Sequence, residues 1–219
     1  MPPKMKFFEK KKLVIASNNK GKIKEISLLL SPFEIEVVAA GEFPFTEPEE
    51  TGDTFIENAE IKSRYYATHT GVLSLSDDSG LEVEALDGAP GVISANWAEK
   101  VPGGERDFNF AMQRVENELI AAGIKTRGNL SVAEKAKLKA NFTCVLSLCD
   151  DMGKTINFTG KVFGTLQFPP KGDKGFGYDA IFVADGMDKT FAEIDREEKY
   201  KISHRSDAFA KLKKYFEQD

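Results

Sequence analysis

The first residues that could do chemistry form the run Ser17-Asn18-Asn19-Lys20-Gly21-Lys22, between an apolar strand and the start of a helix. Backbone N–H groups at such a junction are expected to lack partners, and the helix dipole favours an anion there. Ser17 and Asn18 would add donors, while Lys20 and Lys22 would add positive charge. The run therefore has the properties of a phosphate-binding loop, although an ordinary helix cap with solvated lysines explains it equally well.

Carboxylates form the second group, with Glu49 and Glu50 in an acidic loop and Asp77 and Asp78 at the end of a predicted strand. Open α/β sheets bind their ligands at the C-terminal ends of strands. Mg²⁺ takes one or two carboxylates together with phosphate oxygens. Asp78 could also accept a proton from an attacking water. The alternative is a polar Asp-Asp-Ser-Gly turn, which is the better explanation of these residues taken alone.

The third group is the glycine- and aromatic-rich run Gly175–Ala180. It matches the dinucleotide pattern G-x-G-x-x-A, but the following Ile-Phe-Val predicts a strand instead of the required helix, so that interpretation is rejected. Two glycines that bring aromatic rings close to a ligand fit better. Phe176 or Tyr178 could stack on a nucleobase, a contact worth roughly 1–3 kcal/mol. A strand-entry turn with core aromatics is the alternative.

The fourth group precedes the last predicted helix and holds Lys199, Ser203, His204 and Arg205. Lys199 is a cation, and the other three side chains could read the edges of a base. The sequence shows no Ser nucleophile elbow or paired Cys that would recruit His204 into a triad. Hydrogen bonding by His204 is therefore expected, and covalent catalysis is not.

The elements that must position these residues follow from hydrophobic periodicity and turn signals. The expected strands are 13–16, 35–39, 72–75, 81–86, 141–149, 155–163 and 179–184. The expected helices are one through Ile23, Ile26 and Leu30, one from Thr54 to about 68 with a Thr54–Glu57 capping box, and those at 106–122 and 207–217. Mixed strands and helices with a central hairpin predict an α/β or α+β sheet core.

Composition narrows the classes of function. The 219 residues carry a net charge of -5, which argues against a protein that coats long nucleic acid. Two His and two Cys are too few for a zinc site made of those ligands alone, so a metal would be a hard cation on carboxylates. Cys144 and Cys149 are expected to be buried free thiols on opposite faces of one strand.

Residues 1–12 are predicted to be a solvated basic tail before a single domain at 13–219. No apolar run approaches the roughly 20 residues that cross a bilayer, so no membrane partner is expected. The apolar stretch after the tail is too short for the core of a signal peptide. The default expectation is a cytoplasmic protein.

The order of the motifs is more specific than any one of them. They are Ser-x-Asn-x-x-Lys at 17–22, Glu-Glu-Thr-Gly at 49–52, Thr-Phe-x-Glu-Asn-Ala at 54–59, Asp-Asp-Ser-Gly-Leu at 77–81, Gly-Ala-Pro-Gly at 88–91, Phe-Gly-Tyr-Asp at 176–179 and Ser-His-Arg at 203–205. This set closely resembles the inosine triphosphate pyrophosphatase family, from about Leu13 to the C-terminus. One departure is Asn96, because the family usually has Ser-Ala-Arg where this chain has Ser-Ala-Asn.

The resemblance implies a two-lobed mixed α/β sheet with flanking helices and a central cleft. It implies Mg²⁺-dependent hydrolysis of ITP, dITP and XTP to the monophosphate and pyrophosphate, by a homodimer. By motif match, Asp78 would be metal ligand and general base, and Glu49 or Glu50, with Glu49 favoured, would complete the metal site. The substrate would be bound by Ser17, Asn18, Asn19, Lys20, Gly21, Lys22, Ser79, Phe176, Gly177, Tyr178, Asp179, Lys199, His204 and Arg205.

Three alternatives stay open at this point. One is a Maf-like nucleotide pyrophosphatase that acts on dTTP and UTP. Another is a non-catalytic regulator that binds nucleotides. The third is a nucleic-acid binder that uses the basic tail, against which the negative net charge argues.

Overall fold

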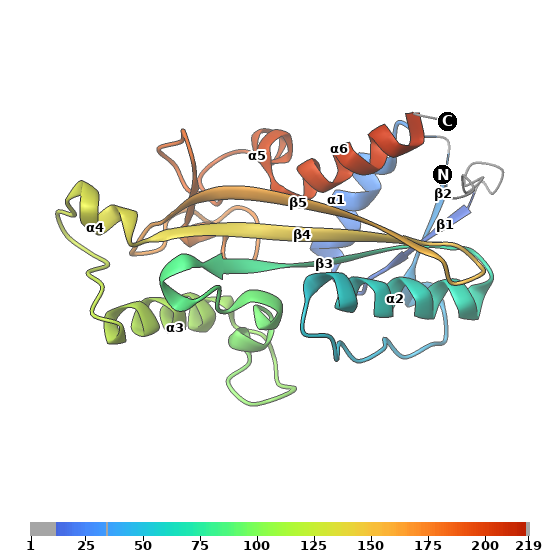
Figure 1. Ribbon diagram of the computed structural model, residues 1–219, viewed down its shortest axis with the longest axis horizontal. Coiled ribbons are helices and arrows are strands. Elements are labelled where there is room, and N and C mark those ends of the chain that lie inside the picture. Colours follow the sequence, from blue (N-terminus) through green and yellow to red (C-terminus); the bar gives the residue numbers. More distant parts are fainter. Residues whose placement is uncertain (1–11, 34, 218–219) are drawn as a thin grey trace. The chain divides into compact units, whose positions relative to one another are not determined.

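In the part of the chain that the structure describes, six strands form one mixed sheet in the order β2-β1-β3-β4-β5-β6. β1 pairs in parallel with β2 and β3, and β5 pairs antiparallel with β6. The structure is a computed structural model that describes residues 12–33 and 35–217. The mixed sheet with flanking helices confirms the α/β prediction (Figure 1).

The bounds of the elements are as follows. The strands are β1 (Lys12–Ala16), β2 (Glu36–Ala39), β3 (Leu73–Val83), β4 (Lys139–Cys149), β5 (Thr155–Leu166) and β6 (Phe182–Ala184). The α-helices are α1 (Lys20–Leu30), α2 (Phe55–Thr70), α3 (Phe108–Ala121), α4 (Val132–Ala136), α5 (Arg196–Ile202) and α6 (His204–Glu217). None of these helices, within the described residues, is long and apolar enough to cross a membrane.

The chain divides into two compact units. The first contains the chain up to Asp78, Cys144–Gly160 and the chain from Ala208. The second contains Ser79–Thr143 and Lys161–Asp207. The predicted basic tail at 1–12 lies outside the described residues except for Lys12, which is the first residue of β1.

The first unit buries both faces of its sheet. Leu13 and Ile15 of β1 belong to one apolar cluster, which also contains residues of α1 and α6. Val14 and Ala16 point the other way and pack in a cluster with Tyr66 of α2. Figure 1 shows α1 and α6 on one side of these strands and α2 on the other. Burial on both faces explains why β1 is an uninterrupted apolar run.

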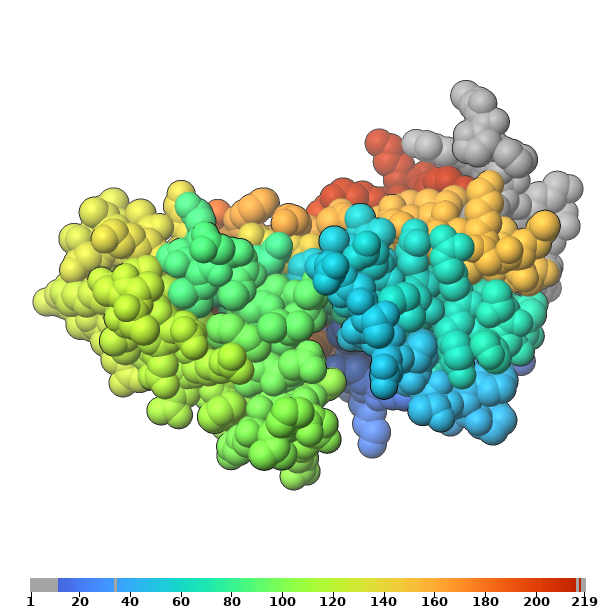
Figure 2. Space-filling view, turned by 60° about the horizontal axis from the view of Figure 1, so that its bottom comes forward, coloured from blue at the N-terminus to red at the C-terminus, as the bar shows by residue number. Residues whose placement is uncertain are grey.

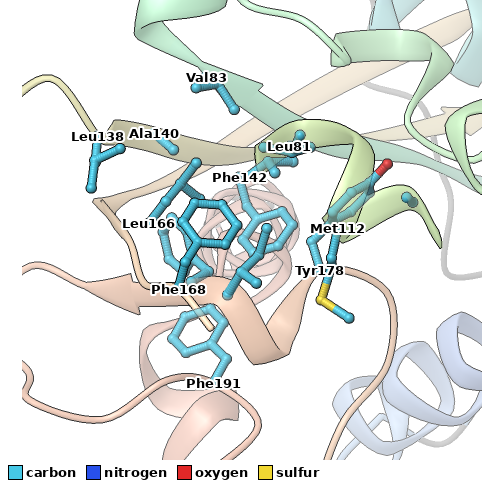
Figure 3. Close-up of a cluster of buried hydrophobic side chains, with 14 of the residues drawn as sticks. Leu81, Val83, Met112, Leu138, Ala140, Phe142, Leu166, Phe168, Tyr178 and Phe191 are labelled. Atoms are coloured by element: carbon cyan, nitrogen blue, oxygen red, sulfur yellow. The ribbon is translucent and has the colours of Figure 1, made fainter. Parts of the chain in front are cut away.

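The second unit packs α3 and several loops against the other ends of the long strands. Its core joins Leu81 of β3, Phe142 of β4 and Met112 of α3 (Figure 3), and it also contains Phe182 of β6. The rings of Phe142 and Phe182 lie 4.7 Å apart, a distance at which aromatic pairs attract beyond their burial. This core fixes the strand ends and loops that carry the predicted nucleoside residues.

The Asp-Asp-Ser-Gly segment corrects one prediction. Separate strands at 72–75 and 81–86 joined by a turn were expected, but β3 runs unbroken through this segment. The reason is tertiary, because Ser76 donates to the Ala59 carbonyl and Asp77 pairs with Lys22. Buried polar groups with such partners can stay inside a strand. Glu84–Leu86, expected to extend the strand, forms a 3₁₀ turn.

Two further boundaries differ from the prediction. The strand expected at 179–184 starts only at Phe182, because Asp179–Ile181 forms a 3₁₀ turn. The last helix begins at His204 instead of Asp207, and Lys199 lies on the separate helix α5. Ser203 explains the earlier start, since its hydroxyl accepts from the N–H of Ser206 and so caps α6. Cys144 and Cys149 are buried and form no disulfide in the described part of the chain, as predicted.

Candidate active site

The centre of the first unit holds a lysine that sequence reasoning missed. Lys62 of α2 is buried, and its Nζ donates to the backbone oxygen of Asp77 at 2.9 Å. The same Nζ lies 3.4 Å from Oδ1 of Asp78 and contacts the carboxylate of Glu50. Burial lowers the pKa of the Lys62 ammonium, but the attraction of Asp78 and Glu50 outweighs burial, so its pKa lies above the usual value. Lys62 is therefore a buried cation among carboxylates.

A second lysine reaches the same strand from α1. Lys22 Nζ lies 2.7 Å from Oδ1 of Asp77, whose side chain is fully buried. It also lies 3.4 Å from the Asp77 backbone oxygen, the acceptor that Lys62 uses. Adjacent residues of a strand point to opposite faces, which is why Asp77 meets Lys22 of α1 while Asp78 meets Lys62 of α2.

Asp78 carries the feature most suggestive of a ligand. Its Oδ2 is buried and has no hydrogen-bond partner among the described residues. Burial raises the pKa of the Asp78 carboxyl, and the nearby lysines offset this only in part. An oxygen of this kind suits a bound cation, which would supply the missing partner and favour the ionised carboxylate.

The carboxylates around Asp78 fit a hard cation. In this first-unit cluster the carboxylates of Glu50, Asp77 and Asp78 outnumber the ammonium groups of Lys22 and Lys62. Among the described residues, no three His, Cys, Asp or Glu side chains form a group that could hold a metal alone. Mg²⁺ commonly uses one or two carboxylates and completes its shell with water and phosphate oxygens, so this donor set fits it.

The acidic loop before α2 presents its glutamates at the surface of the first unit. Figure 2 shows this part of the chain in light blue, and both Glu49 and Glu50 are exposed. Gly52 lets the loop pass close to α2, since a Cβ there would lie 2.5 Å from Cβ of Glu57. Of the two glutamates, Glu50 is the one whose carboxylate reaches Lys62 beside Asp78. Of the two glutamates predicted to bind a metal, Glu50 is thus the one whose carboxylate contacts the cluster around Asp78.

The predicted phosphate loop at 17–22 differs in one respect from the expectation. The N–H groups of Gly21 and Lys22 are not without partners, because Oδ1 of Asn19 accepts from them at 2.9 and 3.1 Å. Asn18 donates to Glu47 in the acidic loop at 2.9 Å, and Lys20 is exposed. The side chain of Asn19 is thus an ordinary N-cap, and the charge that the loop directs inward belongs to Lys22.

In the second unit, the side chains of Phe176 and Lys199 lie next to each other. Lys199 forms a buried ion pair with Asp179 at 2.6 Å, and its Nζ lies 4.9 Å from the centre of the Phe176 ring. The Phe176 N–H donates to the same Asp179 carboxylate at 2.9 Å, and its side chain is 37% exposed. Gly175 has φ +76°, and a Cβ there would clash with Oδ2 of Asp179. Asp179 thus fixes both the turn and the cation beside an accessible ring.

Tyr178 has a different environment from Phe176. Its ring is buried against Phe108, and its hydroxyl donates to the carbonyl of Ser94 at 2.8 Å. Burial raises the pKa of the Tyr178 phenol above its ordinary value. Of the two rings expected to stack on a base, Phe176 is the accessible one. Gly177 has φ +68°, which lets the turn between the two rings form without strain.

The Ser-His-Arg segment is buried in the second unit. His204 stacks on Phe142 with ring centres 5.0 Å apart. Arg205 is 1% exposed and donates to the hydroxyl of Ser79 at 3.2 Å. Ser79 directly follows Asp78 in the sequence of β3. Asn96, which stands where the family usually has Arg, is exposed at the start of a 3₁₀ turn.

A mixed α/β sheet whose strand β3 carries two carboxylates, each paired with a lysine from a flanking helix, defines a protein suited to a phosphorylated, cation-bound ligand. The chain belongs to the Ham1 family, whose model matches residues 13–215.

Individual relatives cover nearly the whole chain. It is 52% identical over 209 residues to the dITP/XTP pyrophosphatase of Zymomonas mobilis, covering 95% of this chain and 93% of that protein. The Brucella melitensis dITP/XTP pyrophosphatase is 47% identical, with coverages of 94% and 93%. Among solved structures, a HAM1 protein from Coxiella burnetii is 36% identical with a TM-score of 0.82, covering 95% of this chain and 99% of that one.

Proposed function

We propose that this protein hydrolyses the non-canonical purine nucleoside triphosphates ITP, dITP and XTP to the nucleoside monophosphate and pyrophosphate. Family membership and the names of relatives that align over nearly their full length support the reaction and the substrate class. The observation in this chain that carries the proposal is the unpartnered Oδ2 of Asp78, whose other oxygen lies beside the Lys62 ammonium group, next to an Asp77 that pairs with Lys22. The activity would remove such nucleotides from the pool.

Asp78 is proposed to act as metal ligand and general base. Asp78 and Glu50 would hold Mg²⁺. Glu49, the preceding residue of the loop, is the alternative to Glu50 as the second ligand. Bound Mg²⁺ would supply charge neutralisation on the phosphates and a water of lowered pKa. The Asp78 carboxylate would take the proton of the attacking water, and pyrophosphate would leave.

The two lysines are proposed to bind the triphosphate. Lys22 and Lys62 are held by carboxylates of the first unit and together place two positive charges at one position of β3. Preorganised cations stabilise the charge that develops on transferring phosphoryl groups. The phosphate loop would be completed by Ser17, Asn18, Asn19, Lys20 and Gly21. The backbone N–H groups of Gly21 and Lys22 would reach the phosphates after their hydrogen bonds to Oδ1 of Asn19 break.

Recognition of the base is assigned to the second unit. Phe176 would stack on the purine, with Lys199, Asp179, Gly177 and Tyr178 fixing its position. His204, Arg205 and Ser79 would present donors to the nucleoside. Inosine and xanthosine carry a 6-oxo group that accepts hydrogen bonds, whereas the 6-amino group of adenine would leave such donors unpaired.

The test is a panel of ITP, XTP, dITP, ATP, GTP, dTTP and UTP with Mg²⁺, in which pyrophosphate and phosphate are measured separately. The proposal predicts pyrophosphate release, fastest from the 6-oxo purines ITP, dITP and XTP. Preference for dTTP and UTP would establish the Maf-like alternative instead. Tight binding without turnover would establish a nucleotide-binding regulator.

We propose a homodimer from the family resemblance. The negative net charge and the short apolar runs are the basis for proposing a cytoplasmic protein that acts on small molecules and binds neither nucleic acid nor membrane. The mass of the particle in solution, measured by light scattering, tests the dimer. Salt-dependent retention on DNA or RNA would contradict the absence of a nucleic-acid partner.

A further inference from the structure

Asp77 is a buried carboxylate with a protein partner on each oxygen. Oδ1 lies 2.7 Å from Nζ of Lys22, and Oδ2 accepts from the thiol of Cys144 at 3.1 Å. The side chain is fully buried, which makes its ionised form costly without such partners. Both oxygens are therefore engaged by protein groups, in contrast to the Oδ2 of its neighbour Asp78.

The backbone of Asp77 connects the two lysines. Its carbonyl oxygen accepts from Nζ of Lys62 at 2.9 Å and lies 3.4 Å from Nζ of Lys22. Two ammonium groups that share one acceptor repel each other. The Asp77 carboxylate offsets that repulsion on the Lys22 side, while Asp78 and Glu50 do so on the Lys62 side.

A lysine at this position needs such a partner to keep one orientation. The Lys22 side chain is 14% exposed and has a flexible four-carbon stem with considerable rotamer freedom. It lies in the first turn of α1, where the positive end of the helix dipole disfavours a cation. A fixed carboxylate 2.7 Å from its Nζ offsets both effects.

We propose that Asp77 is a positioning residue that holds Lys22 for the triphosphate, and that Cys144 in turn fixes the Asp77 carboxylate. Asp77 and Asp78 have different roles because adjacent side chains of a strand point to opposite faces. Asp77 faces Lys22 and Cys144, while Asp78 faces Lys62. Asp77 is thus neither metal ligand nor base. This inference rests on the proposed function only in naming the triphosphate as the ligand.

The test is a double-mutant cycle on Asp77→Asn and Lys22→Met, read out by calorimetric binding of inorganic tripolyphosphate and by steady-state kinetics with ITP. Each single variant is expected to weaken tripolyphosphate binding about tenfold, and the double variant no more than Lys22→Met alone. Asp77→Asn should also raise KM for ITP more than it lowers kcat. Multiplying effects, or unchanged binding in Asp77→Asn, would overturn the positioning role.

Two controls separate positioning from general damage. Lys24→Met makes the same charge change at an exposed site of α1 and should leave tripolyphosphate binding unchanged. Binding of inosine, a probe without phosphates, should be the same in Asp77→Asn as in the natural protein. Loss of inosine binding would mean that Asp77 supports the structure as a whole, which contradicts the proposal.

Cys144 gives a second route if Asp77→Asn fails to fold. Cys144→Ala removes the donor to Oδ2 and should weaken tripolyphosphate binding about threefold, whereas Cys144→Ser keeps a donor and should stay within about twofold. Equal behaviour of the two variants would overturn the role of Cys144. A natural protein that binds tripolyphosphate but releases no pyrophosphate from ITP would refute the proposed function while leaving this cycle intact.

Discussion

Nζ of Lys62 lies 3.4 Å from Oδ1 of Asp78, while Oδ2 of the same carboxylate has no partner among the described residues. One oxygen is thus held by the protein and the other is left for a ligand. Burial raises the pKa of this carboxyl in spite of Lys62, so its ionised form is costlier than in water, and a bound cation would offset that cost. A cation bound at Oδ2 would therefore favour the ionised form of Asp78.

Asp78→Asn should remove activity and stabilise the metal-free fold. Loss of the general base is expected to lower kcat by about 10²–10⁴-fold. Because the folded-state pKa of Asp78 is raised, its contribution to stability is full below the ordinary pKa of 3.8 and is lost as pH rises through the folded-state value. The Asn variant should therefore unfold at a higher temperature than the natural protein at pH 7 without metal, and the gap should close near pH 3.8.

Thermal unfolding followed by circular dichroism at both pH values measures this effect. An Asn variant that is less stable than the natural protein at neutral pH would contradict the claim that burying the ionised Asp78 carboxylate destabilises the metal-free fold. Turnover of ITP at the natural rate would contradict the role of Asp78 as base.

The pH dependence of hydrolysis should follow the same carboxyl. At low Mg²⁺, kcat/KM should fall as pH is lowered through the raised pKa of Asp78, because the base is then protonated. Higher Mg²⁺ should move this acid limb to lower pH, since a bound cation favours the carboxylate. The measurement is a set of pH profiles for ITP at several Mg²⁺ concentrations. An acid limb whose midpoint does not change with Mg²⁺ concentration would contradict the role of Asp78 as a metal ligand.

Lys62→Met should lower kcat by about 10²–10³-fold, the usual loss on removing one preorganised charge-stabilising group. Arg64→Gln is the matched control on α2, since Arg64 is exposed and its partners, Glu60, Thr155 and the Gly153 carbonyl, are not residues of the proposed site. Such surface pairs contribute little to stability, so this variant should keep nearly full activity. Equal losses of kcat in the two variants would show that any charge change on α2 impairs turnover, and would contradict the proposed role of Lys62 at the phosphates.

Phe176→Ala should raise KM for ITP by about tenfold, the loss of one base-stacking contact, with a smaller effect on kcat. Phe163→Ala removes another exposed phenylalanine of the second unit, one that is 58% exposed on β5, and should change neither constant. Initial-rate kinetics across ITP concentrations make the comparison. An unchanged KM in Phe176→Ala would remove this ring from the proposed base site.

The sequence predicted the elements whose signals are local. The capping box of Thr54 and Glu57 is present at the start of α2, and Asn19 caps α1. The Asp-Asp-Ser-Gly segment was the main error, because its residue types favour turns while its partners Lys22 and Lys62 lie far away in the chain. Long-range pairs of this kind override local propensity and leave no signal in the segment itself.

Lys62 was missed for a related reason. It lies on the buried face of α2, in register with Phe55, Asn58, Ala59 and Tyr66. A lysine at a position that helical periodicity assigns to the interior is a signal that could have been used, because buried lysines are rare unless paired. The identity of its partners could not be predicted, since Glu50 and Asp78 come from a loop and a strand.

The most direct test of the proposed specificity is a competition between ITP and ATP, mixed at equal concentration with Mg²⁺ and the natural protein, with all nucleotides followed by chromatography. ITP should be converted to IMP and pyrophosphate while ATP is consumed at least about 100-fold more slowly, because adenine leaves the donors of the base site unpaired. Equal consumption of ATP, or formation of IDP in place of IMP, would contradict this prediction.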